Sequence, residues 1–162
     1  NNRCGDIDSY IIFYLVESCG MTLEEVKQML QTRSGLYGMS GGAGRDLRDV
    51  QAAAEAGNED AELTIRAYCY SIKKYIGAYA AAMGGLDAIV FGGGIGLGSA
   101  LVRAMSLEGL EFLGVKLDGF KNRMAVAGMD ISMDDAPVRV FVVHTDEEII
   151  VARKAQSFLE QK

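Results

Sequence analysis

The fold of this chain is decided by one stretch of sequence, Leu86-Asp87-Ala88-Ile89-Val90-Phe91-Gly92-Gly93-Gly94-Ile95-Gly96-Leu97-Gly98-Ser99-Ala100. Its first half is a short apolar run that predicts a buried strand, and its second half holds five glycines in the seven positions 92–98. Because glycine has no Cβ, this backbone can approach a ligand closely and turn its N–H groups toward a phosphate. The stretch therefore predicts a strand, a nucleotide-binding glycine loop and a helix that begins near Ser99.

The glycine run does not match the two most familiar nucleotide motifs. A Walker A loop needs a lysine after its last glycine, whereas Gly98 is followed by Ser99 and Ala100. A dinucleotide fingerprint that starts at Gly94 would need a third glycine at position 99, and no second strand with a terminal acid follows cleanly. A dehydrogenase is thus disfavoured. Two interpretations stay open, a phosphate loop and a strand-to-helix turn that binds nothing.

Composition excludes several classes of partner. The chain has 162 residues, a formal net charge of −6 and no run of basic residues, so we expect no nucleic-acid partner. No apolar run reaches the roughly 18 residues of a membrane helix, so no membrane partner is expected. Three widely spaced cysteines predict neither a disulfide framework nor a zinc site. These features favour a cytoplasmic protein, and because residue 1 is Asn we expect a piece of a longer chain.

Hydrophobic periodicity predicts alternating helices and strands. The predicted helices cover residues 8–18, 22–30, 45–57, 59–83, 99–105 and 145–159, the predicted strands cover 87–91 and 138–143, and 34–44 is predicted to be a loop. Each strand leads through a loop into a helix, which indicates an α/β fold with both loops at the carboxyl edge of a parallel sheet. The apolar stripe of helix 59–83 fits either a buried core or a subunit interface.

The loop after the second predicted strand holds the other candidate residues. Thr145 and Glu148 have the spacing of a capping box, which leaves Glu147 without a structural role. Glu147 could hold Mg²⁺ beside nucleotide phosphates, or it could complement the helix dipole. His144, the single histidine, is assigned a structural role. Arg3 could reach a developing phosphoryl charge, or it could be an ordinary surface arginine.

Seven short strings occur in order over nearly the whole chain. They are Arg3-Cys4-Gly5-Asp6-Ile7-Asp8, Ser34-Gly35-Leu36, Asp46-Leu47-Arg48-Asp49, Tyr75-Ile76-Gly77-Ala78-Tyr79, Gly84-Gly85-Leu86-Asp87-Ala88, Gly94-Ile95-Gly96 and Thr145-Asp146-Glu147-Glu148. Together they resemble the C-terminal part of the acetate and butyrate kinase family, in the superfamily of acetate and sugar kinases, heat-shock proteins and actin. Such a set is far more specific than a single glycine loop.

The resemblance implies an α/β fold: the C-terminal part of a ribonuclease-H-like domain of the actin and hexokinase type, helix-rich, with a short βαβα nucleotide-binding segment. Residues 1–162 would then be a single incomplete domain, the nucleotide-binding half. The family interconverts ATP plus acetate with ADP plus acetyl phosphate by in-line phosphoryl transfer, uses Mg²⁺ and is homodimeric. Such transfer depends chiefly on positioning and charge stabilisation, which these residue types can supply.

The resemblance also implies a role for individual residues. Arg3 matches the catalytic arginine that stabilises the transferring phosphoryl group, and Glu147 matches the metal-linked glutamate. The matches to nucleotide-binding residues are Asp46, Leu47 and Arg48, at the adenosine, and Gly94, Ile95, Gly96, Leu97 and Gly98, in a second nucleotide loop.

The chain departs from the family pattern at two levels. Leu97 and Gly98 stand where the family usually has Glu and Asn, so those polar side-chain contacts are lost while backbone contacts can persist. Members of the family also have an upstream half that carries the acid pocket and further catalytic residues. None of that half lies in residues 1–162, so these residues alone are not expected to catalyse. Two alternatives therefore remain, a propionate or butyrate kinase and a non-catalytic nucleotide-binding or assembly module.

Overall fold

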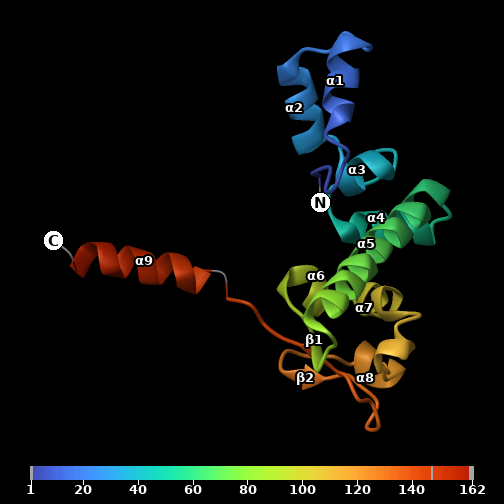
Figure 1. Ribbon diagram of the computed structural model, residues 1–162, viewed down its shortest axis with the longest axis vertical. Helices are drawn as coiled ribbons and strands as arrows, with labels where there is room; N and C mark the ends of the chain where they lie inside the picture. Colours follow the sequence, from blue (N-terminus) through green and yellow to red (C-terminus); the bar gives the residue numbers. More distant parts are fainter. Residues whose placement is uncertain (1, 147, 161–162) are drawn as a thin grey trace. The chain divides into compact units, whose positions relative to one another are not determined.

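The computed structural model describes residues 2–146 and 148–160, and the chain divides into two compact units, Asn1–Ile72 and Lys73–Lys162 (Figure 1). The boundary between the units falls inside the longest helix, α5 (Glu59–Met83), whose limits agree with those predicted from the apolar periodicity. The α/β fold class is confirmed, because helices predominate and a small mixed sheet lies in the second unit.

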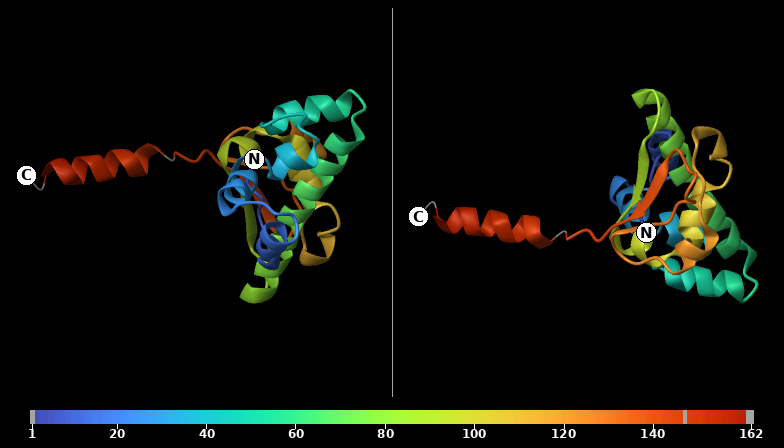
Figure 2. Two further views of the ribbon diagram at one scale, coloured as in Figure 1. Left: turned by 90° about the horizontal axis from the view of Figure 1, so that it is seen from above. Right: turned by 90° about the horizontal axis from the view of Figure 1, so that it is seen from below.

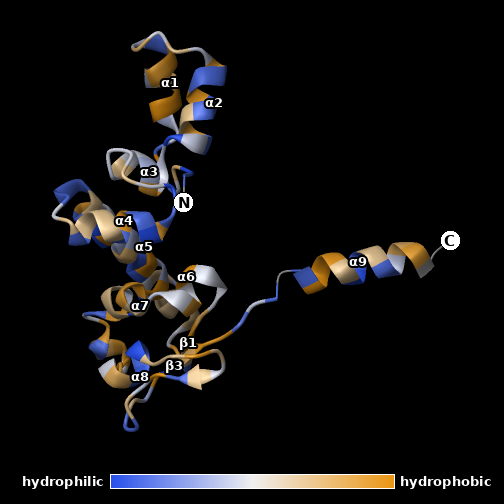
Figure 3. Ribbon diagram, turned by 180° about the vertical axis from the view of Figure 1, so that it is seen from behind, coloured by the Kyte–Doolittle hydropathy of each residue, from blue (hydrophilic) through white to orange (hydrophobic). Residues whose placement is uncertain are grey.

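The first unit is helical. Its elements are α1 (Tyr10–Glu17), α2 (Leu23–Thr32), α3 (Gly35–Met39), α4 (Leu47–Glu55) and the first part of α5. The capping box predicted at Thr22 and Glu25 is present and opens α2. Helix α1, mostly orange in Figure 3, contacts α2.

Helix α3 corrects one prediction, because residues 34–44 were expected to form a loop throughout. Glycine and serine have low helix propensity, which removed the periodic signal from this stretch. Tertiary packing overrides that propensity here: Leu36 is buried, and the N–H of Gly38 donates to the Ser34 carbonyl. A single helical turn therefore forms inside the glycine-rich segment.

A three-stranded sheet organises the second unit. It contains β1 (Ala88–Phe91), β2 (Met129–Asp130) and β3 (Arg139–Val142), in the order β1-β3-β2. Strands β1 and β3 are parallel, with Ala88 opposite Arg139 and Phe91 opposite Val142, and they run side by side in both views of Figure 2. Strand β2 pairs with β3 in the antiparallel sense.

One face of this sheet supplies the core. Burial alternates along both long strands, so that Ile89, Phe91, Val140 and Val142 are buried while their neighbours are more exposed. The other members of the core cluster come from the connection between the strands: Leu107, Leu110, Val115, Ile131 and Val138. The sheet is therefore covered by the chain that joins its own strands.

The first residues of the connection from β1 to β3 differ from the prediction. Residues 92–98 were predicted to be an open glycine loop, but Gly93–Gly98 forms helix α6. The next helix begins after Ser99, close to the predicted start, and Ser99 caps it, since its hydroxyl accepts the N–H of Val102. The elements that follow α6 are α7 (Ala100–Leu107), the 3₁₀ turn η1 (Glu111–Leu113), α8 (Gly119–Arg123) and β2.

The chain ends in α9 (Glu148–Glu160), whose residues 148–159 are all exposed. Within residues 2–146 and 148–160, no helix has the length and hydrophobicity needed to cross a membrane.

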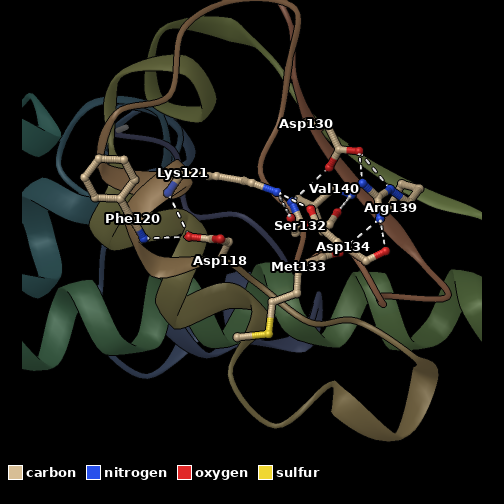
Figure 4. Close-up of polar contacts among 9 residues, drawn as sticks. All are labelled: Asp118, Phe120, Lys121, Asp130, Ser132, Met133, Asp134, Arg139 and Val140. Atoms are coloured by element: carbon tan, nitrogen blue, oxygen red, sulfur yellow. Dashed lines mark hydrogen bonds and ion pairs between the residues drawn. The ribbon is translucent and has the colours of Figure 1, made fainter.

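A polar network fixes the hairpin between β2 and β3 (Figure 4). The guanidinium of Arg139 donates to the Asp130 carboxylate and to the Met133 carbonyl. Lys121 on α8 donates to the Ser132 carbonyl and to Asp134. Burial raises the pKa of Asp130, but hydrogen bonds from Ser132 and Arg139 outweigh burial and hold that pKa below its ordinary value. Arg139 therefore ties β3 to β2 and to the loop between them, and Lys121 ties that loop to α8.

The Ser132 hydroxyl supports β3 from a fully buried position. Its Oγ accepts the N–H of Val140 at 2.6 Å. We expect Ser132→Ala to lower the free energy of unfolding by about 1–3 kcal/mol, because it leaves that buried N–H without a partner. Urea denaturation measures the loss, and Ser71→Ala on the exposed surface of α5 is the control. A loss below about 0.5 kcal/mol would contradict this role.

Candidate functional site

Two loops meet where the parallel strands end. Phe91, the last residue of β1, lies opposite Val142, the last residue of β3, and the N–H of Val143 donates to the Phe91 carbonyl at 2.9 Å. Helix α6 follows β1, and residues 143–146 follow β3. The carboxyl edge of this sheet therefore brings together the two segments that the sequence identified as candidate loops.

A direct hydrogen bond joins these segments. The Thr145 hydroxyl accepts the N–H of Gly93 at 3.0 Å, across 52 positions of sequence. Gly92 must lack a side chain here, since a Cβ at that position would lie 2.8 Å from Cγ2 of Thr145. Gly93 has a φ of +68°, a conformation that glycine adopts without strain. The start of α6 is thus fixed by the threonine.

This contact corrects the role predicted for Thr145. The sequence suggested that Thr145 and Glu148 cap the last helix as a capping box. In the structure the carboxylate of Asp146 accepts the N–H of Ile149 in the first turn of α9, at 3.1 Å. An aspartate one residue further along therefore does the capping, and the threonine is available to hold the glycine segment.

A cavity of about 640 Å³ opens at this junction. It is lined by Gly93, Gly94, Leu97, His144, Thr145, Asp146 and Glu148. Its volume lies within the range of small-molecule sites, roughly 300–1,000 Å³. At Gly94 an added Cβ would meet nothing within 4 Å, so the bare backbone borders open space. The cavity combines exposed backbone on one side with carboxylates and an imidazole on the other.

The structure places the predicted glycine-segment residues in different environments. Gly94 and Leu97 line the cavity. Gly96 is buried against β1, where a Cβ would lie 3.2 Å from the Phe91 carbonyl carbon. Ile95 is half-buried and Gly98 is exposed. Open space beside the backbone therefore lies at Gly94, while the glycine at 96 serves the packing of α6 on the strand.

Sequence reasoning missed most of the opposite wall. His144, Asp146 and Glu148 line the cavity there, although His144 was assigned a structural role and Glu148 a capping role. Glu147, the predicted metal residue, lies outside the described residues. The signal that could have found its neighbours is their position, since all follow the carboxyl end of a parallel strand. Among the residues that the structure describes, no three His, Cys, Asp or Glu side chains form a ready metal site.

The other predicted site residues belong to the first unit. Arg3 is exposed and lies between two backbone anchors, since Cys4 donates to the Leu30 carbonyl and Ser34 donates to the Asn2 carbonyl. Leu47 is buried, so its side chain belongs to the core of this unit and only its backbone can meet a ligand.

Asp46 and Arg48 form an exposed pair at the start of α4. Asp46 is the N-cap and accepts both the N–H and the guanidinium of Arg48. The side-chain hydrogen bond from Arg48, reinforced by the backbone one, lowers the pKa of Asp46 to about 2. The carboxylate therefore stays charged well below neutral pH, and the guanidinium is held next to the helix start.

This pairing predicts a measurable titration. In Arg48→Ala we expect the Asp46 carboxyl to titrate nearer its ordinary 3.8 than the value of about 2, as followed by NMR of the carboxyl carbon. Because the folded pKa is depressed, the stabilisation of α4 is present above the ordinary value and is lost as pH falls toward 2. Arg66→Ala, which breaks a surface pair with Glu62, is the control. An unchanged Asp46 midpoint in Arg48→Ala would contradict the assignment.

Comparisons with known proteins agree with one another. The chain matches the model of the Acetokinase family over residues 1–153. It is 43% identical over 158 residues to an acetate kinase of Methanosarcina thermophila, covering 98% of this chain and 38% of that protein. It is 45% identical over 159 residues to an acetate kinase of Bacteroides fragilis, covering 98% of this chain and 40% of that protein.

Solved structures give the same result. The crystal structure of Porphyromonas gingivalis acetate kinase matches with a TM-score of 0.88 and 38% identity, over 98% of this chain and 40% of that one. A propionate kinase from Francisella tularensis matches with a TM-score of 0.84 and 32% identity, over 93% and 38%. The chain spans about two fifths of the length of these relatives. By sequence and by structure, this chain belongs to the Acetokinase family.

Proposed function

We propose that this chain supplies the nucleotide-binding side of an acetate kinase, which transfers a phosphoryl group reversibly between ATP and acetate with the help of Mg²⁺. The observation that carries the proposal is the cavity at the carboxyl ends of β1 and β3, bordered by the bare backbone of Gly94. Family membership supplies the reaction, since the curated relatives are acetate kinases. Residues 1–162 alone are expected to bind nucleotide without turning over acetate.

The residues present suit a nucleotide and its metal ion. The backbone at Gly94 can lie against phosphate oxygens without steric hindrance. The carboxylates of Asp146 and Glu148 on the facing wall offer the oxygen ligands that Mg²⁺ prefers, and Glu147 remains the proposed metal-linked glutamate. Bound Mg²⁺ would neutralise phosphate charge. We assign Arg3 to the transferring phosphoryl group, and Asp46, Leu47 and Arg48 to the adenosine.

A second candidate differs only in the acid. The structural match to a propionate kinase, at a TM-score of 0.84, favours a longer carboxylic acid as the alternative to acetate. Comparing kcat/KM for acetate, propionate and butyrate in a protein of the relatives' full length decides between them. A non-catalytic nucleotide-binding module would show ADP binding but no turnover with any of these acids.

We also propose a homodimer in the cytoplasm. Exposed apolar side chains in the second unit support an interface between copies: Tyr75, Tyr79 and Met83 on α5, and Val90 on β1. The rings of Tyr75 and Tyr79 lie 5.9 Å apart, so they form one aromatic surface rather than isolated exposed residues.

Gly94 gives the sharpest test of nucleotide binding. In Gly94→Ala a methyl group would stand between the backbone and the phosphates, so we expect ADP affinity in the presence of Mg²⁺ to fall by about tenfold in calorimetry. Gly77→Ala is the matched control, because Gly77 is also a helical glycine with nothing within 4 Å of an added Cβ. Equal ADP affinity in the two variants would contradict a nucleotide at the glycine segment.

Glu147 can be tested together with the metal. We expect chelation of Mg²⁺ to weaken ADP binding by about tenfold in the unsubstituted chain. Glu147→Ala should weaken ADP binding by a similar factor. Chelation of Mg²⁺ should then have little further effect on that variant, because the substitution and the chelation remove the same interaction. Glu24→Ala, at a surface ion pair with Lys27, is the control. Additive losses from chelation and from Glu147→Ala would contradict a metal-linked role for Glu147.

A further inference from the structure

Arg103 on α7 is a buried arginine that the proposed reaction does not use. Its side chain is only 2% exposed, although arginine is almost never fully buried without partners. Its Nη1 donates to the carbonyls of Gly96 and Leu97 at 2.7 and 2.8 Å. Its Nε and Nη2 donate to the side-chain and backbone oxygens of Asn122, at 2.8 and 2.7 Å. Every nitrogen of the guanidinium is thus engaged.

The positive charge of Arg103 is balanced without a carboxylate. No ion pair to Arg103 occurs within residues 2–146 and 148–160. The groups that face its charge are the oxygens of Asn122 on α8 and the carbonyls at the end of α6, where helix carbonyls carry partial negative charge. Burial lowers the pKa of Arg103, but a guanidinium keeps its proton in proteins. Burying this cation costs free energy, which its hydrogen bonds to α6 and Asn122 offset. These bonds therefore indicate that Arg103 holds α6 in a defined position.

Asn122 completes the arrangement. Asn122 lies on α8 and is buried. Its Nδ2 donates to the Ala100 carbonyl at 2.9 Å, and its Oδ1 accepts the Nε–H of Arg103. The Asp118 side chain caps α8 through the N–H groups of Phe120 and Lys121. The junction between α6 and α7 is therefore tied to α8 by one arginine and one asparagine.

Helix α6 needs such an anchor because it has few side chains of its own. Four of its six residues are glycine. At Gly94 and Gly98 even an added Cβ would meet nothing within 4 Å. Thr145 holds the first N–H of α6, and Arg103 holds the carbonyls near its end. The two contacts fix opposite ends of the segment that borders the cavity.

We propose that Arg103, oriented by Asn122, is a positioning residue for nucleotide binding: it holds the glycine helix in the one placement that meets the phosphates. This inference rests on the proposed function, because it requires that α6 contact the nucleotide. Arg103 itself is buried behind α6 and touches no ligand. Lysine cannot replace it, since a single ammonium does not reproduce the planar set of donors that reaches α6 and Asn122 together.

The test compares Arg103→Lys, Asn122→Ala and the control Arg123→Lys, an exposed arginine next to Asn122. ADP affinity with Mg²⁺ is measured by calorimetry, and amide hydrogen exchange is followed at 96–100 and at Val140 and Val142. We expect Arg103→Lys to weaken ADP binding by about tenfold and to speed exchange at 96–100 only. Asn122→Ala should change both in the same direction by less, and Arg123→Lys should change neither.

Each other outcome counts against the inference. An ADP affinity of Arg103→Lys within about twofold of the unsubstituted chain would overturn it while leaving the proposed function intact. Exchange that accelerates equally at Val140 and Val142 would indicate loss of overall stability, which also overturns it. If Arg103→Lys does not fold, Asn122→Ala decides by the same two measurements. Failure of the unsubstituted chain to bind ADP would overturn the proposed function itself.

Discussion

The parallel pairing of β1 with β3 is the constraint on which the second unit depends. Parallel strands cannot be joined by a tight turn, so the chain must cross over between them, and here the crossover carries α6, α7, α8 and β2. The crossover covers one face of the sheet and supplies much of the core. Because the strands point the same way, the segments that follow them emerge at one edge, and Gly93 meets Thr145 across 52 positions of sequence.

Hydrogen bonds between side chains and the backbone then set the details of this edge. The hydroxyl of Ser132 holds β3 through Val140, the hydroxyl of Thr145 holds the start of α6, and the guanidinium of Arg103 holds its end. Apolar packing alone would not specify these positions, since four of the six residues of α6 are glycine. The polar groups therefore determine where the glycine backbone lies, and with it the shape of the cavity.

The sequence predicted the elements that have strong local signals. The apolar stripe of α5 gave its limits, the Thr22 and Glu25 capping box opened α2, and two apolar runs identified β1 and β3. Glycine-rich segments were harder, because α3 and α6 form through tertiary contacts that propensity does not report. The two-residue strand β2 is too short for any periodic signal.

The site was predicted in part for similar reasons. The two loops were expected at one sheet edge because strand direction follows from the strand-loop-helix order, and the pairing of β1 with β3 confirms it. The hydrogen bond from Gly93 to Thr145 could not be predicted, since a threonine before a helix has an equally good local use as its cap. Arg103 did leave a signal, a single charge in the otherwise uncharged helix Ala100–Leu107, but its partners lie on other elements.

We propose that nucleotide phosphates bind where these two segments meet, and backbone amide NMR during an ADP titration with Mg²⁺ can locate the bound nucleotide. We expect the largest chemical-shift changes to occur together in both walls of the cavity, at Gly93 and Gly94 and at Thr145 and Asp146. A nucleotide site at this junction would be contradicted if the shift changes occurred in neither wall, or in one wall alone.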